Sequence, residues 1–234
     1  MLRSLRGIFL ERRSIPPYNE SGGTMRHAVI LANGTPPAAA AFHRALARST
    51  LFLCADGGAN AARALGARPA AIVGDFDSIT PETLAHFADV TKVRDQDESR
   101  TDTEKAIEYA LARGPFEEIT LLGATSGRLD HVLGHVGLLQ KYLGRVRLVM
   151  EGGDGRAYVA AGDIELHCPR GTVVSFFAVG SPVEGVTTEN LRYPLEGRTL
   201  QLGIQDSISN VVESTPAWIR FERGTLLVIE ITNP

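Results

Sequence analysis

The stretch TLFLCADGGANAARALGARPAAIVGDFDS, residues 50–78, contains the pattern that decides the fold. Its apolar run at 50–55 predicts a strand, the alanine-rich segment at 59–65 predicts a helix, and the run at 70–73 predicts a second strand. Two strands joined by a helix are typical of parallel pairing, because a parallel connection needs a long crossover. The stretch therefore predicts one unit of an α/β sheet.

The same alternation of strands and helices continues on both sides of this stretch. Helix 101–113 has the spacing of a capping box at Thr101 and Glu104. Helix 128–143 shows apolar residues at helical spacing, which predict a buried stripe of Leu129, Val132, Leu133, Val136 and Leu139. We expect a mostly parallel sheet with helices on its faces. The remaining expected elements lie at 27–32, 38–48, 81–88, 89–93, 118–122 and 145–150.

The pattern changes near residues 151–156, after which no long helical stripe follows. Leu200, Leu202 and Ile204 alternate with polar residues or glycine, and the C-terminal segment 227–231 repeats that spacing. These short alternating runs predict a small antiparallel β-sandwich. We therefore predict an α/β domain over 25–152 and a β-sandwich over 153–234. Residues 1–24, rich in arginine, are expected to be a poorly ordered extension.

Composition excludes several classes of function. The formal net charge of −3 gives no broad basic surface for nucleic acid. No run of 18 apolar residues predicts a membrane-spanning helix. Cys54 and Cys168 are too few for a disulfide framework, which is typical of a reducing compartment. We expect a cytoplasmic protein with neither a nucleic acid nor a membrane as its partner.

Five aspartates follow predicted strands or lie near the start of predicted helices. Because parallel strands end at one edge of a sheet, where ligands bind, these carboxylates could converge. Clustered carboxylates repel one another unless a cation neutralises them, and an all-oxygen ligand set suits Mg²⁺. Taken singly, each is better explained as a turn or helix-dipole residue, so the hypothesis depends on their shared position after strands. They are Asp56, Asp75, Asp77, Asp102 and Asp130.

Neighbouring residues are suited to phosphate. Gly57 and Gly58 allow the backbone to approach a phosphate closely, and Lys105 and Arg128 could offset its charge. Together these parts suggest phosphoryl-type transfer, in which positioning and charge neutralisation supply most of the catalysis. His131 and its neighbour one turn later, His135, lack a third nitrogen ligand, and we interpret them as packing or surface residues.

Four segments, in this order along the chain, resemble the thiamine pyrophosphokinase family. The resemblance extends from Met25 onward, with weaker matches at Tyr193-Pro194-Leu195 and Ser209-Asn210. It implies an α/β domain followed by a β-sandwich, and the transfer of pyrophosphate from ATP to thiamine. It also implies a homodimer with active sites between the subunits. The four segments are ADGGAN at 55–60, GDFDS at 74–78, TDTEKA at 101–106 and GRLDH at 127–131.

The resemblance also implies roles for single residues. The Mg²⁺ ligands would be Asp75, Asp77 and Asp102, which would form the catalytic set together with Asp130. Thiamine would be bound by Ser209 and Asn210. The ATP-binding residues would be Asp56, Gly57, Gly58, Thr101, Lys105 and Arg128.

Several alternatives stay open at this point. The proton acceptor is either Asp130 or a metal-bound oxygen. Val211 stands where an acidic residue is expected, and Tyr193 and Trp218 are candidates for stacking on a substrate ring. A pyrophosphokinase for another alcohol such as a pterin, a metal-dependent phosphohydrolase and a non-enzymatic binding protein are the alternative functions.

Overall fold

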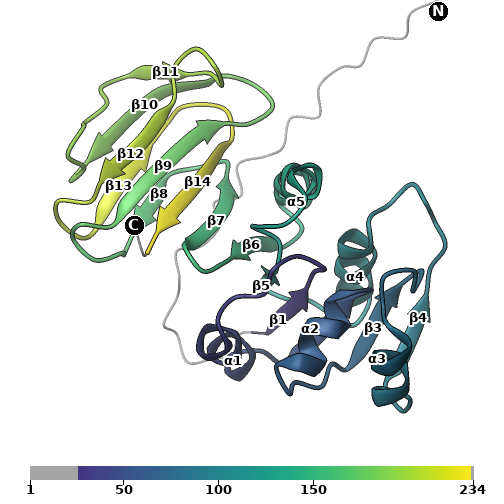
Figure 1. Ribbon diagram of the computed structural model, residues 1–234. Coiled ribbons are helices and arrows are strands. Elements are labelled where there is room, and N and C mark those ends of the chain that lie inside the picture. The colour runs from purple at the N-terminus through teal and green to yellow at the C-terminus, as the bar shows by residue number, and fades with distance from the viewer. Residues whose placement is uncertain (1–25, 233–234) are drawn as a thin grey trace, which may run out of the picture.

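The computed structural model describes residues 26–232, so the expectation for residues 1–24 lies outside the described part of the chain. Strands and helices alternate up to residue 151, and strands alone follow (Figure 1). The helices are α1 (Ala39–Ala47), α2 (Gly58–Ala64), α3 (Pro81–His86), α4 (Asp102–Leu111) and α5 (Leu129–Lys141). The first seven strands are β1 (His27–Leu31), β2 (Leu51–Ala55), β3 (Ala71–Gly74), β4 (Thr91–Arg94), β5 (Glu118–Leu122), β6 (Arg147–Glu151) and β7 (Gly155–Ala160). The other seven are β8 (Ile164–Leu166), β9 (Val173–Ala178), β10 (Val183–Glu189), β11 (Arg198–Leu200), β12 (Ser207–Val211), β13 (Ala217–Arg220) and β14 (Leu226–Ile231).

Ten strands form one large sheet in the order β12-β9-β14-β7-β6-β5-β1-β2-β3-β4. Strands β1 to β6 pair in parallel, as the helical crossovers between them require. Strand β7 pairs antiparallel with β6, and the sheet continues antiparallel through β14, β9 and β12. The large sheet therefore runs without interruption across the predicted boundary at residue 152.

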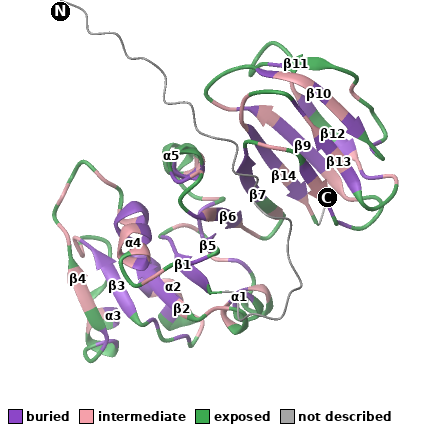
Figure 2. Ribbon diagram, turned by 180° about the vertical axis from the view of Figure 1, so that it is seen from behind, coloured by how far each residue is buried: buried purple, intermediate pink, exposed green. Residues whose placement is uncertain are grey.

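The inner parallel strands are covered on both faces, whereas the edge strand β4 has no buried residue. In β1, Val29 and Leu31 face α1, α2 and α3, while Ala28 and Ile30 face α4 and α5. Because both faces are covered, the inner strands are mostly apolar without polar alternation, and every residue of β1 is buried (Figure 2).

The antiparallel end of the large sheet packs on a second sheet of four strands, in the order β11-β10-β13-β8. Apolar residues of β9, β14 and β7 meet those of β8, β10 and β13 in a separate core. The predicted fold class, an α/β sheet followed by an antiparallel sandwich, is confirmed. None of the described helices is both long and apolar enough to span a bilayer.

Two expectations about buried faces are wrong. In α5, Leu129 and Leu133 are 81% and 70% exposed, and the buried residues are His135, Leu138 and Leu139. Val132 and Val136 are half-buried against the core and Leu139 is buried, so the expected stripe is confirmed at these three positions and wrong at Leu129 and Leu133, which lie at the surface.

The alternating run at 199–204 likewise does not form one strand. Strand β11 ends at Leu200, and Leu202 and Ile204 lie exposed in a turn that Gly203 closes with a φ of 76°. Here the sequence alternates without a second sheet beneath it.

Candidate active site at the edge of the sheet

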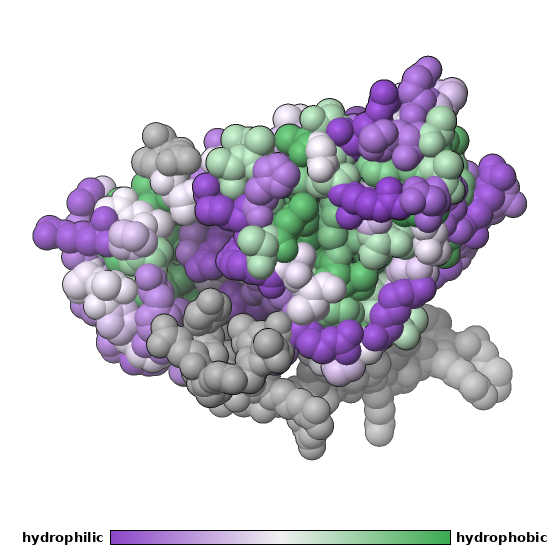
Figure 3. All heavy atoms as spheres, turned by 90° about the horizontal axis from the view of Figure 1, so that it is seen from below, coloured by the Kyte–Doolittle hydropathy of each residue, from purple (hydrophilic) through white to green (hydrophobic). Residues whose placement is uncertain are grey.

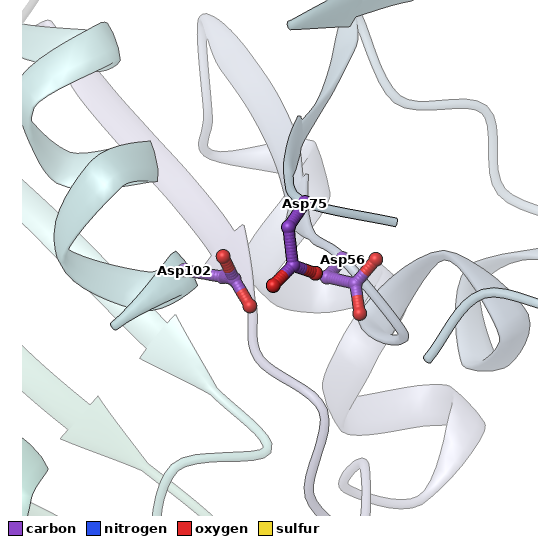
Figure 4. Close-up of side chains that lie close together, drawn as sticks. All are labelled: Asp56, Asp75 and Asp102. Atoms are coloured by element: carbon purple, nitrogen blue, oxygen red, sulfur yellow. The ribbon is translucent and has the colours of Figure 1, made fainter. Parts of the chain in front are cut away.

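Three aspartates converge where β2 and β3 end. Asp56 follows β2, Asp75 follows β3, and Asp102 is the first residue of α4, which packs on these two strands. One carboxylate oxygen from each lies within 4.8 Å of the others. Figure 4 shows the three side chains gathered together, with the Asp102 carboxylate directed toward Asp75. Among residues 26–232, this trio is the one group of acidic, His or Cys side chains arranged to hold a metal ion.

The trio leaves one buried oxygen without a partner. Asp56 is only 2% exposed, and its Oδ2 accepts a hydrogen bond of 2.9 Å from the backbone N–H of Ser78, but its Oδ1 has no hydrogen-bond partner. Burial raises the pKa of Asp56, and the negative charges of Asp102, Asp77 and Asp75 raise it further. A buried, unpartnered oxygen among carboxylates fits a hard divalent cation, which prefers oxygen ligands.

The backbone brings the trio together through close packing at Gly74. A side-chain Cβ added there would lie 2.8 Å from Cβ of Asp56 and 3.1 Å from Cγ of Asp102. The backbone N–H of Asp56 donates to the carbonyl of Val73, which ties the ends of β2 and β3 together. Glycine at position 74 is therefore required for the approach of the two carboxylates.

Asp77 lies outside this group. Its backbone N–H donates to Oδ1 of Asp75 at 3.1 Å, and its exposed carboxylate accepts from the hydroxyl of Ser78 at 2.8 Å. Asp77 thus stabilises the turn after β3. The sequence predicted Asp77 as a metal ligand together with Asp75 and Asp102, but the third member of the trio in the structure is Asp56.

Asn60 of α2 also holds this turn, a role that the sequence pattern does not indicate. Its amide nitrogen donates to the carbonyl of Ser78, and its amide oxygen accepts from the backbone N–H of Thr80. Asn60 belongs to the segment ADGGAN, but the contact joins residues 18 and 20 positions apart, which no local spacing indicates.

The predicted glycines stand close to other parts of the chain. A Cβ at Gly58 would lie 2.1 Å from the carbonyl oxygen of Leu31, and one at Gly57 would lie 2.5 Å from the side chain of Asn33. Both glycines are buried. The packing of α2 against the end of β1 is therefore sufficient to require Gly58, beside any role in binding phosphate.

Two predicted ATP-binding residues act within α4. The hydroxyl of Thr101 accepts from the backbone N–H of Glu104 at 3.3 Å and so caps the helix. The Glu104 carboxylate is bonded by Lys141 at 2.6 Å instead of completing a reciprocal capping box. Lys105 is buried, and its ammonium donates to Oδ1 of Asp102 at 3.0 Å.

Arg128 and Asp130 stand at the exposed start of α5. Nε and Nη2 of Arg128 donate to the Asp130 carboxylate at 3.1 and 2.5 Å. This pairing lowers the pKa of Asp130 to about 2. The structure does not bring Asp130 into the trio of aspartates.

The two histidines of α5 have different surroundings. His131 is exposed, whereas His135 is buried and bonded at both ring nitrogens. Its Nδ1 donates to the carbonyl of Ala124 at 3.0 Å, so its Nε2 accepts from the hydroxyl of Thr103 at 3.1 Å. His135 is thus the packing residue that the sequence predicted.

In the sandwich, Ser209 and Asn210 differ in availability. Ser209 is exposed, with a φ of 56°. Asn210 is 1% exposed, and its amide group bonds the backbone N–H and carbonyl of Tyr193 at 3.0 and 2.7 Å. The amide of Asn210 therefore holds the loop that presents Tyr193, a residue that is 60% exposed. Trp218 is half-buried in β13, with the Arg220 guanidinium 5.0 Å from its ring.

Known proteins match both parts of the chain. Residues 42–150 match the model of the thiamin pyrophosphokinase catalytic domain, and residues 163–226 match that of its vitamin B1 binding domain. Thiamine pyrophosphokinase 1 of Oryza sativa is 28% identical, over 80% of this chain and 81% of the relative. The thiamine pyrophosphokinase of Bacillus subtilis is 27% identical, over 79% of this chain and 88% of the relative.

Solved structures agree with the fold. The crystal structure of thiamine pyrophosphokinase from Bacillus subtilis has a TM-score of 0.79 at 23% identity, covering 89% of this chain and all of that chain. The enzyme from Geobacillus thermodenitrificans has a TM-score of 0.77 at 25% identity, covering 88% of this chain and 98% of that one. With two family models matching most of its length in the expected order, the chain belongs to the thiamine pyrophosphokinase family.

Proposed function

We propose that this protein transfers the pyrophosphoryl group of ATP to the hydroxyl of thiamine, giving thiamine diphosphate and AMP. The observation that carries the proposal is the aspartate trio with its unpartnered buried oxygen on Asp56. A site of this kind suits a reaction in which two phosphoryl groups must be held and their charge neutralised. Family membership supplies the identity of both substrates.

We propose Asp56, Asp75 and Asp102 as the residues that hold Mg²⁺, with Asp77 at the margin of the same turn. When bound there, the ion supplies charge neutralisation of the phosphate oxygens. The chain contributes a ligand set fixed by the ends of β2 and β3 and by the first turn of α4. Its geometry is thus determined by the sheet and not by a mobile loop.

Arg128 is proposed to bind phosphate oxygens, since its guanidinium is exposed at the start of α5. A carboxylate whose pKa is about 2 is a weak base, so Asp130 is better suited to orienting Arg128 than to accepting the hydroxyl proton. The remaining nucleotide contacts proposed are Gly57, Gly58 and Thr101.

The thiamine site is proposed in the sandwich, around exposed Ser209 and the Tyr193 loop that Asn210 holds. We also propose a homodimer whose active sites lie between subunits. Support comes from large apolar side chains left at the surface, which a second copy would cover. Figure 3 shows that apolar residues reach the surface between hydrophilic margins on one face. Over the described residues as a whole, the exposed large apolar side chains are Leu129, Leu133, Tyr193, Leu202, Ile204 and Ile208.

A cytoplasmic location is proposed as well. Cys54 and Cys168 are both free and buried, as is typical of a protein that folds in a reducing compartment.

The proposal is tested by incubating the protein with ATP and Mg²⁺, with and without thiamine, and identifying the products by mass. Thiamine-dependent AMP together with diphosphorylated thiamine is expected. Release of ADP and phosphate, or AMP formation that does not depend on thiamine, would contradict it and indicate a hydrolase or another acceptor. The variant Asp75→Asn, still folded, is expected to lose activity by at least about 100-fold if its carboxylate holds the metal.

A further inference from the structure

We propose that Lys105 is a positioning residue that fixes the carboxylate of Asp102 as a cation ligand. The inference rests on the proposed metal-dependent function and adds to it a residue that touches neither substrate. It also differs from the role in ATP binding that the sequence suggested for this lysine.

The Lys105 ammonium is held from two sides within the protein. Its side chain is 4% exposed, and its Nζ lies 3.0 Å from Oδ1 of Asp102 and 2.9 Å from the carbonyl oxygen of Asp95. Lys105 stands three residues after Asp102 on the same face of α4. Asp95 belongs to the loop after β4, so the ammonium is anchored by a separate element and cannot follow Asp102 if that side chain turns.

The contact decides which part of Asp102 is available. Oδ1 is engaged by Lys105, and the carboxylate also lies close to Gly74, where an added Cβ would lie 3.1 Å from Cγ and 3.2 Å from the same Oδ1. Bonded by the ammonium and packed close to Gly74 at the end of β3, the carboxylate keeps the direction toward Asp75 that Figure 4 shows. Ligands are commonly fixed in this way by residues that do not touch the metal.

A direct contact between Lys105 and nucleotide fits the structure less well. An ammonium that is almost fully buried and already bonds two protein oxygens would have to break both bonds to reach a phosphate. Arg128, by contrast, has a side chain 74% exposed. The lysine therefore acts on the cation site only through its hydrogen bond to Asp102.

The test compares Lys105→Met with the wild-type protein, using Mn²⁺ as the probe. Binding of Mn²⁺ to the nucleotide-free protein is measured from the electron paramagnetic resonance signal of the free ion. We expect the dissociation constant to rise about 10- to 100-fold, the range for loss of a residue that supports a metal ligand. The Mg²⁺ concentration needed for half-maximal AMP formation should rise in parallel, while metal-free ATP binds as it does to the wild type.

Lys141→Met is the matched control. Lys141 of α5 bonds Glu104, which precedes Lys105 in α4. The side chain of Lys141 is 57% exposed, and Glu104 does not belong to the trio. This variant is expected to bind Mn²⁺ within about twofold of the wild type, since the Lys141–Glu104 pair bonds none of the three aspartates. Lys105→Arg retains a charge and donors at the original position and should recover part of the lost affinity. If Lys105→Met does not fold, the arginine variant is compared with wild type instead and should still bind Mn²⁺ measurably more weakly.

Other outcomes separate this inference from the proposed function. Unchanged or tighter Mn²⁺ binding in the folded methionine variant would overturn the inference, as would a loss confined to metal-free ATP binding. A wild-type protein that makes thiamine diphosphate while Lys105→Met behaves normally leaves the function intact. A wild-type protein that makes none, but whose Mn²⁺ affinity depends on Lys105, leaves the inference intact and removes the function.

Discussion

At the scale of single residues, the candidate site is expected to destabilise the folded protein. Asp56 is buried beside two other carboxylates with one oxygen unpaired, and these charges raise its pKa. Without a cation, repulsion among the three should weaken the folded state. This unfavourable charge repulsion lies at the site where the proposed function requires a cation.

Replacing Asp56 by Asn tests this conflict. Asparagine keeps an acceptor for the Ser78 N–H and tolerates the φ of 40° at this position, while it removes one negative charge. In EDTA we expect the variant to be about 1 kcal/mol more stable, or roughly 2–4 °C higher in Tm for a chain of this size. Activity should fall strongly.

Calorimetry and the AMP assay measure the two effects. Asp77→Asn, at an exposed carboxylate outside the trio, should change Tm by less than Asp56→Asn does. A lower Tm for Asp56→Asn in EDTA would show that the trio is not a source of repulsion.

His135 should make stability fall in mild acid. Burial lowers its pKa from the ordinary value of 6.5. Between the lowered value and 6.5 the unfolded chain binds more protons than the folded one, so stability decreases as pH falls through that window. His27, whose pKa burial also lowers, adds to the slope. His135→Gln should reduce the slope, which is at most about 1.4 kcal/mol per pH unit for one group.

Urea unfolding between pH 7.5 and 5.5 provides the measurement. His43→Gln, on the exposed side of α1, is the control and should leave the slope as it is. An unaltered slope in His135→Gln would contradict the prediction.

The sequence predicted the acidic residues but not how they are arranged. Strand ends placed Asp56, Asp75 and Asp102 at one edge of the sheet, because parallel strands share that edge. The sequence could not show which of Asp75 and Asp77 belongs to the trio. The chain bends after β3, and the Asp77 carboxylate bonds the hydroxyl of Ser78 instead. Nor could the sequence show that Lys105 is buried next to Asp102, because the burial of Lys105 depends on the path of the loop that carries Asp95.

At the scale of elements, glycines in two helices have opposite roles. Gly58 begins α2 against the Leu31 carbonyl, where a Cβ would lie 2.1 Å away, whereas Gly134 in α5 has nothing within 4 Å. We expect Gly58→Ala to cost about 1–3 kcal/mol through overpacking. Gly134→Ala should instead gain about 0.5–1 kcal/mol, because alanine favours helix.

The pair is measured by chemical denaturation of each variant. Gly137, also with open space around it in α5, offers a second control that should behave as Gly134 does. A stable Gly58→Ala would mean that α2 can shift away from β1 without loss.

Elements with both faces covered were predicted best. In strand β1 and helix α4 the apolar residues lie against neighbouring elements, so hydrophobic periodicity reports their burial. The buried polar residues Thr103, Glu104 and Lys105 of α4 are not indicated by that periodicity. Periodicity does not report burial at Leu129 and Leu133 of α5 or after β11, where apolar residues lie at the surface. A pattern of residues indicates an apolar face, but it cannot show whether another element covers that face.

At the scale of the whole molecule, the continuous sheet joins the two architectures. We propose the division at residue 152 as one of function, with the cation site before it and the thiamine site after it. The fold does not divide there, because β6 and β7 pair directly and Val159 and Leu227 from the later part line the core beneath α4 and α5.

Unfolding should therefore be a single cooperative event. Removing residues 153–234 would expose the edge of β6 and take Ala157, Val159 and Leu227 from the shared core. An unpaired apolar strand edge is prone to association, so the isolated segment 25–152 should aggregate or show no sharp transition. The full chain should show one calorimetric transition whose van't Hoff and calorimetric enthalpies agree. Scans at several protein concentrations separate this cooperativity from subunit dissociation, which would shift Tm with concentration. Two transitions, or a folded and soluble 25–152 segment, would mean that the pairing of β6 with β7 joins two bodies that are each stable alone.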